Sequence, residues 1–255
     1  MSSASIAAIS VICMFGGALI GLWLQRLLPS HHLSKESQDV VKLGAGLIAT
    51  VTALALGLLV SSAKGTFDEM NSRITQTSAK VLIMDELLAQ YGPEARAVRD
   101  QLRRSIDLLL RRIWPSEATG SPGAMAAIEH GGEIKLIRER LGALTPGDEV
   151  HRQLLAQAQQ VVSEIAQSRW MLIEEAQNTL PTALLVVLVF WLAMLFASFG
   201  LFAPRNATVI AVLCVSALSV AGAILLILEM NQPFQGLIKV SSAPLRFTVA
   251  HLEQP

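Results

Sequence analysis

The sequence predicts an all-α integral membrane protein with four transmembrane helices and a helical soluble domain inserted between the second and the third. Four apolar stretches of 19 to 21 residues contain no Asp, Glu, Lys or Arg: residues 6–24, 43–63, 183–203 and 209–228. At about 1.5 Å of rise per residue, each can cross the roughly 30 Å hydrocarbon core of a bilayer. Between the second and third stretches, residues 64–180 carry 14 Lys/Arg and 16 Asp/Glu, which marks the part that meets water.

The composition excludes several other classes of protein. The chain is 52% hydrophobic and only 16% charged, and its 20 basic residues balance 20 acidic ones, so no basic surface predicts a nucleic-acid partner. Cys13 and Cys214 both lie in apolar stretches, and we interpret them as small buried hydrophobes rather than as a disulfide pair. No catalytic, phosphate-binding or zinc motif is visible. We therefore expect no enzyme activity, no cofactor and no metal site.

The spans divide the chain into four parts. Residues 1–63 hold transmembrane helices 1 and 2, residues 64–180 the soluble domain, residues 181–230 helices 3 and 4, and residues 231–255 a tail with a short helix. Four spans place both termini and the soluble domain on one side of the membrane. Six Lys/Arg flank that side and four flank the other, which favours a cytoplasmic soluble domain.

Glycines and two side-chain stripes characterise the first two spans. Gly16, Gly17 and Gly21 in span one allow another helix to approach closely. In span two, Ala49, Ala53 and Gly57 form a small-residue stripe suited to helix packing. Roughly 100° round the helix lies a second stripe, formed by Thr50, Leu54 and Leu58. A membrane threonine can bond its own i−4 carbonyl, so this stripe is compatible either with a pore or with internal packing.

The spacing of apolar residues predicts that the soluble domain is helical throughout. A coiled-coil-like seam with 3-4 spacing starts directly after span two, and we expect that helix to leave the membrane unbroken: Phe67, Met70, Ile74, Thr77, Val81, Met84, Leu88 and Tyr91. A second helix starts at Pro93 and buries Val98, Leu102, Ile106, Leu109 and Ile113. Residues 116–132 are expected to form a loop, and residues 133–144 a short helix.

A longer helix is predicted over residues 148–180, capped by Asp148. Its expected buried face consists of Val150, Leu154, Val161, Ile165, Leu172 and Ala176. At the end of span four, Glu229 is either paired with Lys64 or a plain interfacial residue. The serines before Ala243 and Pro244 predict the short final helix, lying on the soluble domain or on the membrane surface.

Two passages resemble a known family. They are residues 56–68, LGLLVSSAKGTFD, and residues 229–236, EMNQPFQG. Both resemble the bacterial bestrophin-like domain family, four-span membrane proteins that are remote relatives of the bestrophin anion channels. The spans, the helical insert and the tail follow in the same order, so the resemblance covers nearly the whole chain. Bestrophins follow their Pro-Phe pair with an acidic, calcium-binding cluster, whereas residues 235–239 here read QGLIK, so no calcium site is implied.

The resemblance implies a homo-oligomer, a pentamer in bestrophins, that conducts small anions across the bacterial inner membrane. Both termini would be cytoplasmic, and span two would line the pore with Thr50, Leu54, Leu58, Ser61 and Ser62. A ring of leucines can shut a narrow pore by expelling water. The membrane–cytosol interface would hold Lys64, Phe67, Asp68, Glu229, Asn231, Pro233, Phe234 and Gly236.

A non-conducting membrane scaffold or signalling protein is the alternative. In that case the seam over residues 67–91 binds a partner helix, and the spans serve only as anchors. The two hypotheses differ in where span two turns its Thr50, Leu54 and Leu58 side chains. The alternative expects them to be sealed inside the protomer, whereas a channel needs them on its surface.

Overall fold

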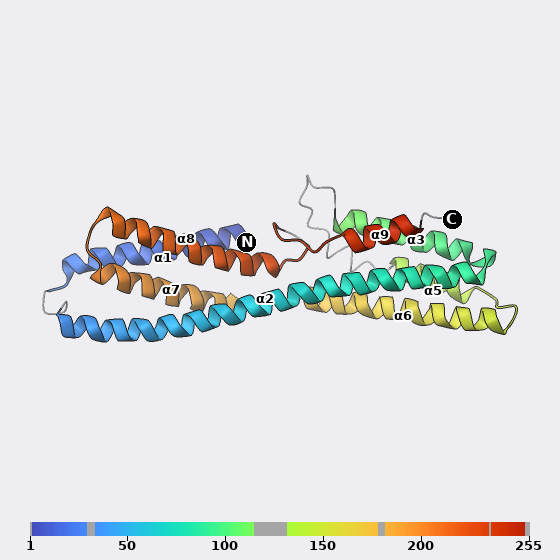
Figure 1. Cartoon of the computed structure of the whole chain (residues 1–255), viewed down its shortest axis with the longest axis horizontal. Helices are drawn as coiled ribbons and strands as arrows, with labels where there is room; N and C mark the ends of the chain where they lie inside the picture. The colour runs from blue at the N-terminus through green and yellow to red at the C-terminus, as the bar shows by residue number, and fades with distance from the viewer. Residues whose placement is uncertain (1, 30–33, 115–131, 178–181, 235, 253–255) are drawn as a thin grey trace. The chain divides into compact units, whose positions relative to one another are not determined.

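The computed structural model describes residues 2–29, 34–114, 132–177, 182–234 and 236–252. Every regular element in these ranges is a helix, which confirms the predicted fold class (Figure 1). The chain forms two compact units, described separately below. Unit 1 is Met1–Gly65 with Thr179–Asn231, and unit 2 is Thr66–Asn178 with Gln232–Pro255. The predicted loop over residues 116–132 lies outside the described residues except for Gly132, which begins a helix.

Unit 1 contains the four apolar stretches. Its helices are α1 (Ser3–Leu27), the first part of α2 (Lys35–Tyr91), α7 (Thr182–Phe202) and α8 (Ala207–Met230). All four are long and apolar enough to cross a membrane. Ser2 caps α1 by accepting a hydrogen bond from Ser5 N, and Asn206 Oδ1 caps α8 by accepting one from Val209 N at 2.8 Å.

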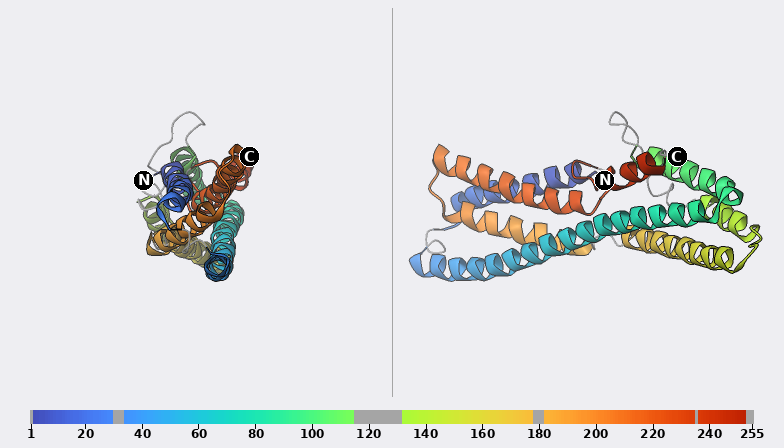
Figure 2. Two further views of the ribbon diagram at one scale, coloured as in Figure 1. Left: turned by 90° about the vertical axis from the view of Figure 1, so that its left-hand side faces the viewer. Right: turned by 45° about the vertical axis from the view of Figure 1, so that its right-hand side comes forward.

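Gly17 and Gly21 let α1 pack closely against α7, as the sequence predicts. Helices α1, α7 and α8 run side by side in both views of Figure 2. A Cβ added to Gly17 would lie 2.6 Å from the backbone oxygen of Ala193, and one added to Gly21 would overlap the carbonyl of Ala197. Gly16, by contrast, faces open space, with no atom within 4 Å of an added Cβ. Only two of the three predicted glycines are therefore needed for the close approach.

Helix α2 continues without a break from the apolar stretch to Tyr91, as predicted. From Phe67 onward its seam is the central strip of the unit 2 core. Six of its eight residues are at most 3% exposed: Met70, Ile74, Val81, Met84, Leu88 and Tyr91. The 3-4 spacing thus correctly identified the buried face of a helix that unit 2 surrounds with its own elements.

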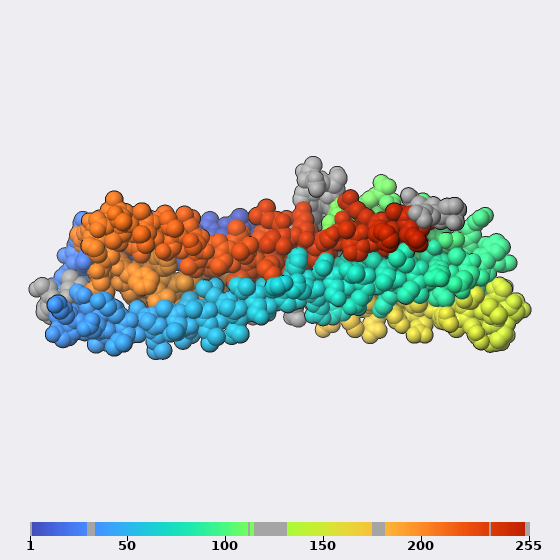
Figure 3. All heavy atoms as spheres, viewed as in Figure 1, coloured from blue at the N-terminus to red at the C-terminus, as the bar shows by residue number. Residues whose placement is uncertain are grey.

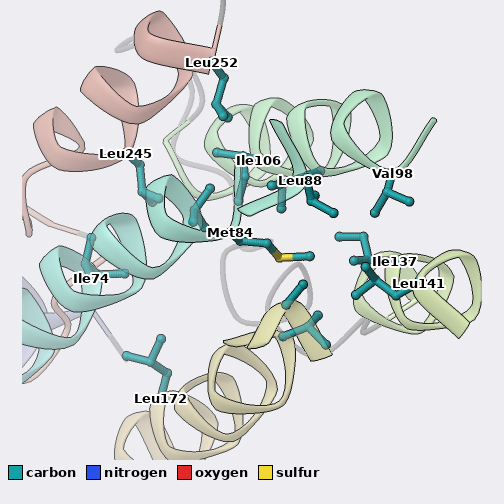
Figure 4. Close-up of a cluster of buried hydrophobic side chains, with 14 of the residues drawn as sticks. Ile74, Met84, Leu88, Val98, Ile106, Ile137, Leu141, Leu172, Leu245 and Leu252 are labelled. Atoms are coloured by element: carbon teal, nitrogen blue, oxygen red, sulfur yellow. The ribbon is translucent and has the colours of Figure 1, made fainter. Parts of the chain in front are cut away.

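In its described residues, unit 2 also contains the 3₁₀ turn η2 (Pro93–Ala95), α3 (Arg96–Ile113), α5 (Gly132–Gly142), α6 (Glu149–Gln177) and α9 (Ala243–Leu252). Figure 4 shows side chains from these helices meeting around the seam of α2. Leu245 and Leu252 of α9 belong to this core, so the final helix lies on the helical unit, one of the two predicted places. The predicted buried face of α3 is confirmed, with Leu109 half-buried and the other four residues buried.

The predicted face of α6 needs one correction. Val150 is 64% exposed, because the first turn of α6 directs its neighbour His151 inward, where the imidazole meets the Tyr91 ring edge-on at 4.9 Å between centroids. Farther along, Leu154, Val161, Ile165 and Leu172 do pack into the core, together with residues that the prediction missed: Ala158, Val162 and Ile173. The side chain of Ala176 lies outside the described residues.

An acid–base pair caps the start of α6. Asp148 Oδ1 accepts a hydrogen bond from His151 N at 2.8 Å and lies 2.6 Å from His151 Nδ1. The hydrogen bond to Asp148 raises the pKa of His151 above its ordinary value, and the backbone N–H and ring of His151 lower the pKa of Asp148. The stabilisation from the charged pair is therefore full between the two ordinary pKa values. It is lost as the pH rises through the raised pKa or falls through the lowered one.

Replacing His151 by Gln is thus expected to destabilise the protein more at about pH 5.5 than at about pH 8.5, where the wild-type imidazole has lost its charge. Because Asp148 is exposed and His151 is only half-buried, the difference should be small, about 1–2 °C in Tm. Thermal unfolding in detergent at the two pH values measures it. His251→Gln, on the exposed face of α9, is the control. An equal loss at both pH values would contradict the assignment of the charged pair.

Candidate functional site on α2

The first part of α2 packs against unit 1 through one narrow face. Thr52, Leu59 and Ala63 are buried on that face, and Ala55 and Leu56 pack half-buried beside them. In the most apolar 18-residue stretch of α2, only 11% of the residues are buried. The corresponding stretches of α1, α7 and α8 each have 28% of their residues buried. Most of the apolar surface of α2 is therefore left for lipid or another chain to cover.

The five residues assigned to a pore lie on this uncovered side. Leu54 and Leu58 are 66% and 63% exposed, and Thr50, Ser61 and Ser62 are exposed as well. None of the five is enclosed by helices of its own protomer. The scaffold alternative expects this stripe to be sealed inside the bundle, and the protomer does not have that arrangement.

The hydroxyl of Thr50 is already used by its own helix. Thr50 Oγ1 donates to Gly46 O at 2.8 Å and to Leu47 O at 2.9 Å. A hydroxyl carries a single proton, so this rotamer presents only oxygen lone pairs to the outside. Thr50 can accept a hydrogen bond from water here, and its O–H must turn away from these carbonyls before it can donate to an anion.

The small-residue stripe is not used inside the protomer. Ala49 is half-buried, Ala53 and Gly57 are exposed, and a Cβ added to Gly57 would meet no atom within 4 Å. Within the protomer this stripe makes no close helix contact at Gly57, and its packing against a helix of another chain stays a prediction. The packing face carries Thr52, Leu59 and Ala63 instead.

The predicted interface residues near the end of span two differ in burial. Lys64 and Asp68 are exposed, whereas Phe67 is half-buried against the core of unit 2. Glu229, at the end of α8, is only 7% exposed. A carboxylate this deeply buried is costly without a cationic or hydrogen-bonding partner, and its pairing with Lys64 stays a prediction.

The Asn-x-Pro-Phe run ends α8 and starts a turn. Asn231 Nδ2 donates to Ile227 O at 2.9 Å, which satisfies a carbonyl at the helix end. Val240 N donates to Pro233 O at 2.8 Å. Gly236, between them, has φ 87°, a left-handed conformation that favours glycine. These contacts give the tail a defined path into α9.

Phe234 anchors the tail in the core of unit 2. It is 8% exposed and meets Trp114 edge-to-face, with ring centroids 6.0 Å apart and an interplanar angle of 82°. Trp114 Nε1 also donates to Val240 O at 2.9 Å, so one indole holds the tail at two points. Sequence reasoning missed Trp114, because no local pattern links the end of α3 to the tail.

Phe234→Ala is expected to lower the free energy of unfolding by about 3 kcal/mol, because it removes a buried ring and leaves a cavity beside Trp114. Phe247→Ala is the matched control, since Phe247 lies on α9 and is 66% exposed. Denaturant unfolding in detergent, followed by tryptophan fluorescence, compares the two variants. Equal destabilisation by both would show that Phe234 is not the anchor.

Charged groups in unit 2 form structural pairs. Arg99 clamps Asp85 through two parallel hydrogen bonds, Nε to Oδ1 and Nη2 to Oδ2, both 2.8 Å long, and the contact raises the pKa of Arg99. Lys80 Nζ lies 3.3 Å from Glu164 Oε2. Within the described ranges, no three His, Cys, Asp or Glu residues come together as a metal site.

Four long apolar helices and an all-helical second unit define this chain as an α-helical membrane protein. The Bestrophin-like domain model matches residues 12–245, and the chain belongs to the Bestrophin-like family. No curated protein matches its sequence.

The fold is that of solved bestrophin structures. Crystal structures of point mutants of a bacterial Bestrophin homolog from Klebsiella pneumoniae match nearly the whole chain. One matches with a TM-score of 0.67 at 14% identity, covering 99% of this chain and 97% of that one. A second has a TM-score of 0.65 at 13% identity, covering 99% and 98% of the two chains. A third has a TM-score of 0.63 at 13% identity, covering 94% and 97%.

Proposed function

We propose that this protein is a subunit of an oligomeric channel for small anions, with its pore lined by α2. The observation that carries the proposal is the exposed Thr50–Leu54–Leu58 stripe on the membrane helix that the protomer covers least. Membership of the Bestrophin-like family and the fold of bestrophin structures support it.

The order of side chains along the stripe suits a gated pore. Thr50 lies about 6 Å along the helix from Leu54, Leu58 lies about 6 Å further, and Ser61 and Ser62 follow one turn later. Copies of α2 around a common axis would place two apolar rings between two hydroxylated ones. Narrow apolar rings can shut a pore by dewetting, and hydroxyls outside them can replace part of an ion's hydration shell.

The proposed assembly is a pentamer in the bacterial inner membrane, with unit 2 and both termini in the cytoplasm. Family membership and the Lys/Arg excess on that side of the spans support this arrangement. A ring would also cover apolar surface on α2 that the protomer leaves open.

The scaffold alternative loses the feature that suggested it. Its binding surface was the seam of α2, but Met70, Val81 and Met84 in that seam are fully buried by other helices of unit 2. A partner helix would have to displace elements of the protein's own core.

Reconstitution in liposomes tests the channel. Vesicles loaded with a chloride-sensitive dye should show chloride entry well above that of empty vesicles when they contain the purified oligomer. The subunit number is measured on the same sample by mass photometry. Flux equal to that of empty vesicles, over a range of pH and voltage, from an intact oligomer would refute conduction.

A further inference from the structure

A groove of about 300 Å³ lies between the start of α2 and the end of α7. Its lining comes from both helices: Val41, Lys42, Ala45, Gly46, Ala49, Ser198, Phe199, Phe202 and Ala203. Figure 3 shows this part of unit 1 in space-filling form, with the start of α2 in blue below α7 in orange. The proposed function assigns no role to this surface.

Small residues keep the groove open. Ala45, Gly46 and Ala49 would permit a close helix contact, yet a Cβ added to Gly46 meets no atom within 4 Å. This is the reverse of Gly21, where the missing side chain is needed for the backbone of α7 to come close. Between α2 and α7, small side chains therefore leave apolar space rather than close it.

The groove is polar at one end and apolar along its length. Lys42 directly precedes the apolar stretch over residues 43–63, so its ammonium lies at the depth of lipid headgroups. Ala49 lies about 10 Å further along the helix, within the hydrocarbon. Phe199, 51% exposed, adds an aromatic surface to one wall.

We propose that this groove holds one acyl chain of an anionic phospholipid, with the lipid phosphate paired to Lys42. A groove of about 300 Å³ is many times larger than one water requires, which leaves room for several methylene groups. It runs about 10 Å along α2 from Lys42 to Ala49, within the roughly 15 Å depth of one leaflet of the hydrocarbon core. Cationic pockets between membrane helices are typical sites for anionic headgroups.

Of the charged residues near the groove, Lys42 is the cation placed to bind an anionic headgroup there. Arg205, at the same end of unit 1, donates to Leu22 O at 2.9 Å and to Gln25 Oε1 at 3.2 Å. Asp39 is exposed one turn before Lys42 but does not line the groove. An anionic headgroup thus meets Lys42, and the carboxylate nearest to it along the described part of α2, that of Asp39, lies outside the groove.

Native mass spectrometry of the detergent-solubilised oligomer, incubated with phosphatidylglycerol or phosphatidylcholine, tests the headgroup. The wild type should retain phosphatidylglycerol at least about fivefold better, a difference of about 1 kcal/mol. Lys42→Gln should abolish that preference. Lys35→Gln, an exposed lysine two turns earlier that does not line the groove, should keep it. Equal retention of the two lipids by the wild type, or an unchanged preference in Lys42→Gln, would overturn the proposal.

Gly46→Leu and Gly44→Leu test the groove itself. Both glycines lie on α2 with open space around them, but only Gly46 lines the groove. Filling it should reduce phosphatidylglycerol retention severalfold in Gly46→Leu and leave Gly44→Leu like the wild type. Unchanged retention in Gly46→Leu would overturn the proposal, as would a change in its subunit number, which would make the groove a contact between copies. Neither readout depends on conduction.

Discussion

Replacing Leu54 and Leu58 together by alanine should raise the anion flux of reconstituted protein by about tenfold. In the proposed pore these residues form two adjacent apolar rings. Alanine widens both rings and removes apolar surface that would otherwise expel water. A tenfold change corresponds to a barrier about 1.4 kcal/mol lower. Stopped-flow chloride flux into liposomes, normalised to the oligomer content of the vesicles, measures the effect.

Two exposed leucines on other apolar helices provide the control. Leu184 on α7 and Leu218 on α8 are 43% and 54% exposed, and replacing both by alanine removes a similar amount of apolar surface from the protomer. That variant should conduct like the wild type. A similar increase in both double variants would point to leakage through a loosened protein. No increase in Leu54→Ala/Leu58→Ala would show that these leucines do not limit the flux.

The helical fold followed from the sequence, although α2 begins at Lys35, eight residues before the predicted apolar stretch. Charge-free stretches and the 3-4 spacing of apolar residues report burial directly, because a helix repeats every 3.6 residues. The seam of α2 and the buried face of α3 were therefore predictable residue by residue. The face of α6 failed at Val150, since the capping turn at Asp148 sets which residue points inward, and a hydrophobic pattern does not contain that information.

The candidate site could be predicted only in part. The sequence shows a stripe of small residues and a stripe of Thr and Leu on α2, but it does not reveal which of them packs inside the protomer. In the structure neither does, because Thr52, Leu59 and Ala63 fill that role. The hydrogen bonds of Thr50 depend on its rotamer, and the contact between Trp114 and Phe234 joins segments far apart in the chain. No local sequence pattern encodes these contacts.

Because α1 packs closely against α7, replacing glycine by alanine should change the free energy of unfolding in opposite directions at Gly21 and Gly16. Gly21→Ala should destabilise the protein by about 2 kcal/mol, because the new Cβ would overlap the Ala197 carbonyl and the backbone of α7 must move. Gly16→Ala, on the same helix in open space, should stabilise it by up to about 1 kcal/mol through the higher helix propensity of alanine. Denaturant unfolding in detergent measures both.

The sign of the change matters more than its size. Any general effect of alanine on a membrane helix, on detergent binding or on the unfolded state acts on both variants in the same direction. Only contact with α7 distinguishes Gly21 from Gly16. Stabilisation by both substitutions would mean that α1 and α7 are not in close backbone contact at Ala197. Destabilisation at Gly21 alone would instead establish that the bundle of unit 1 is held by backbone approach, leaving the larger apolar side chains of α2 free to face other chains or lipid.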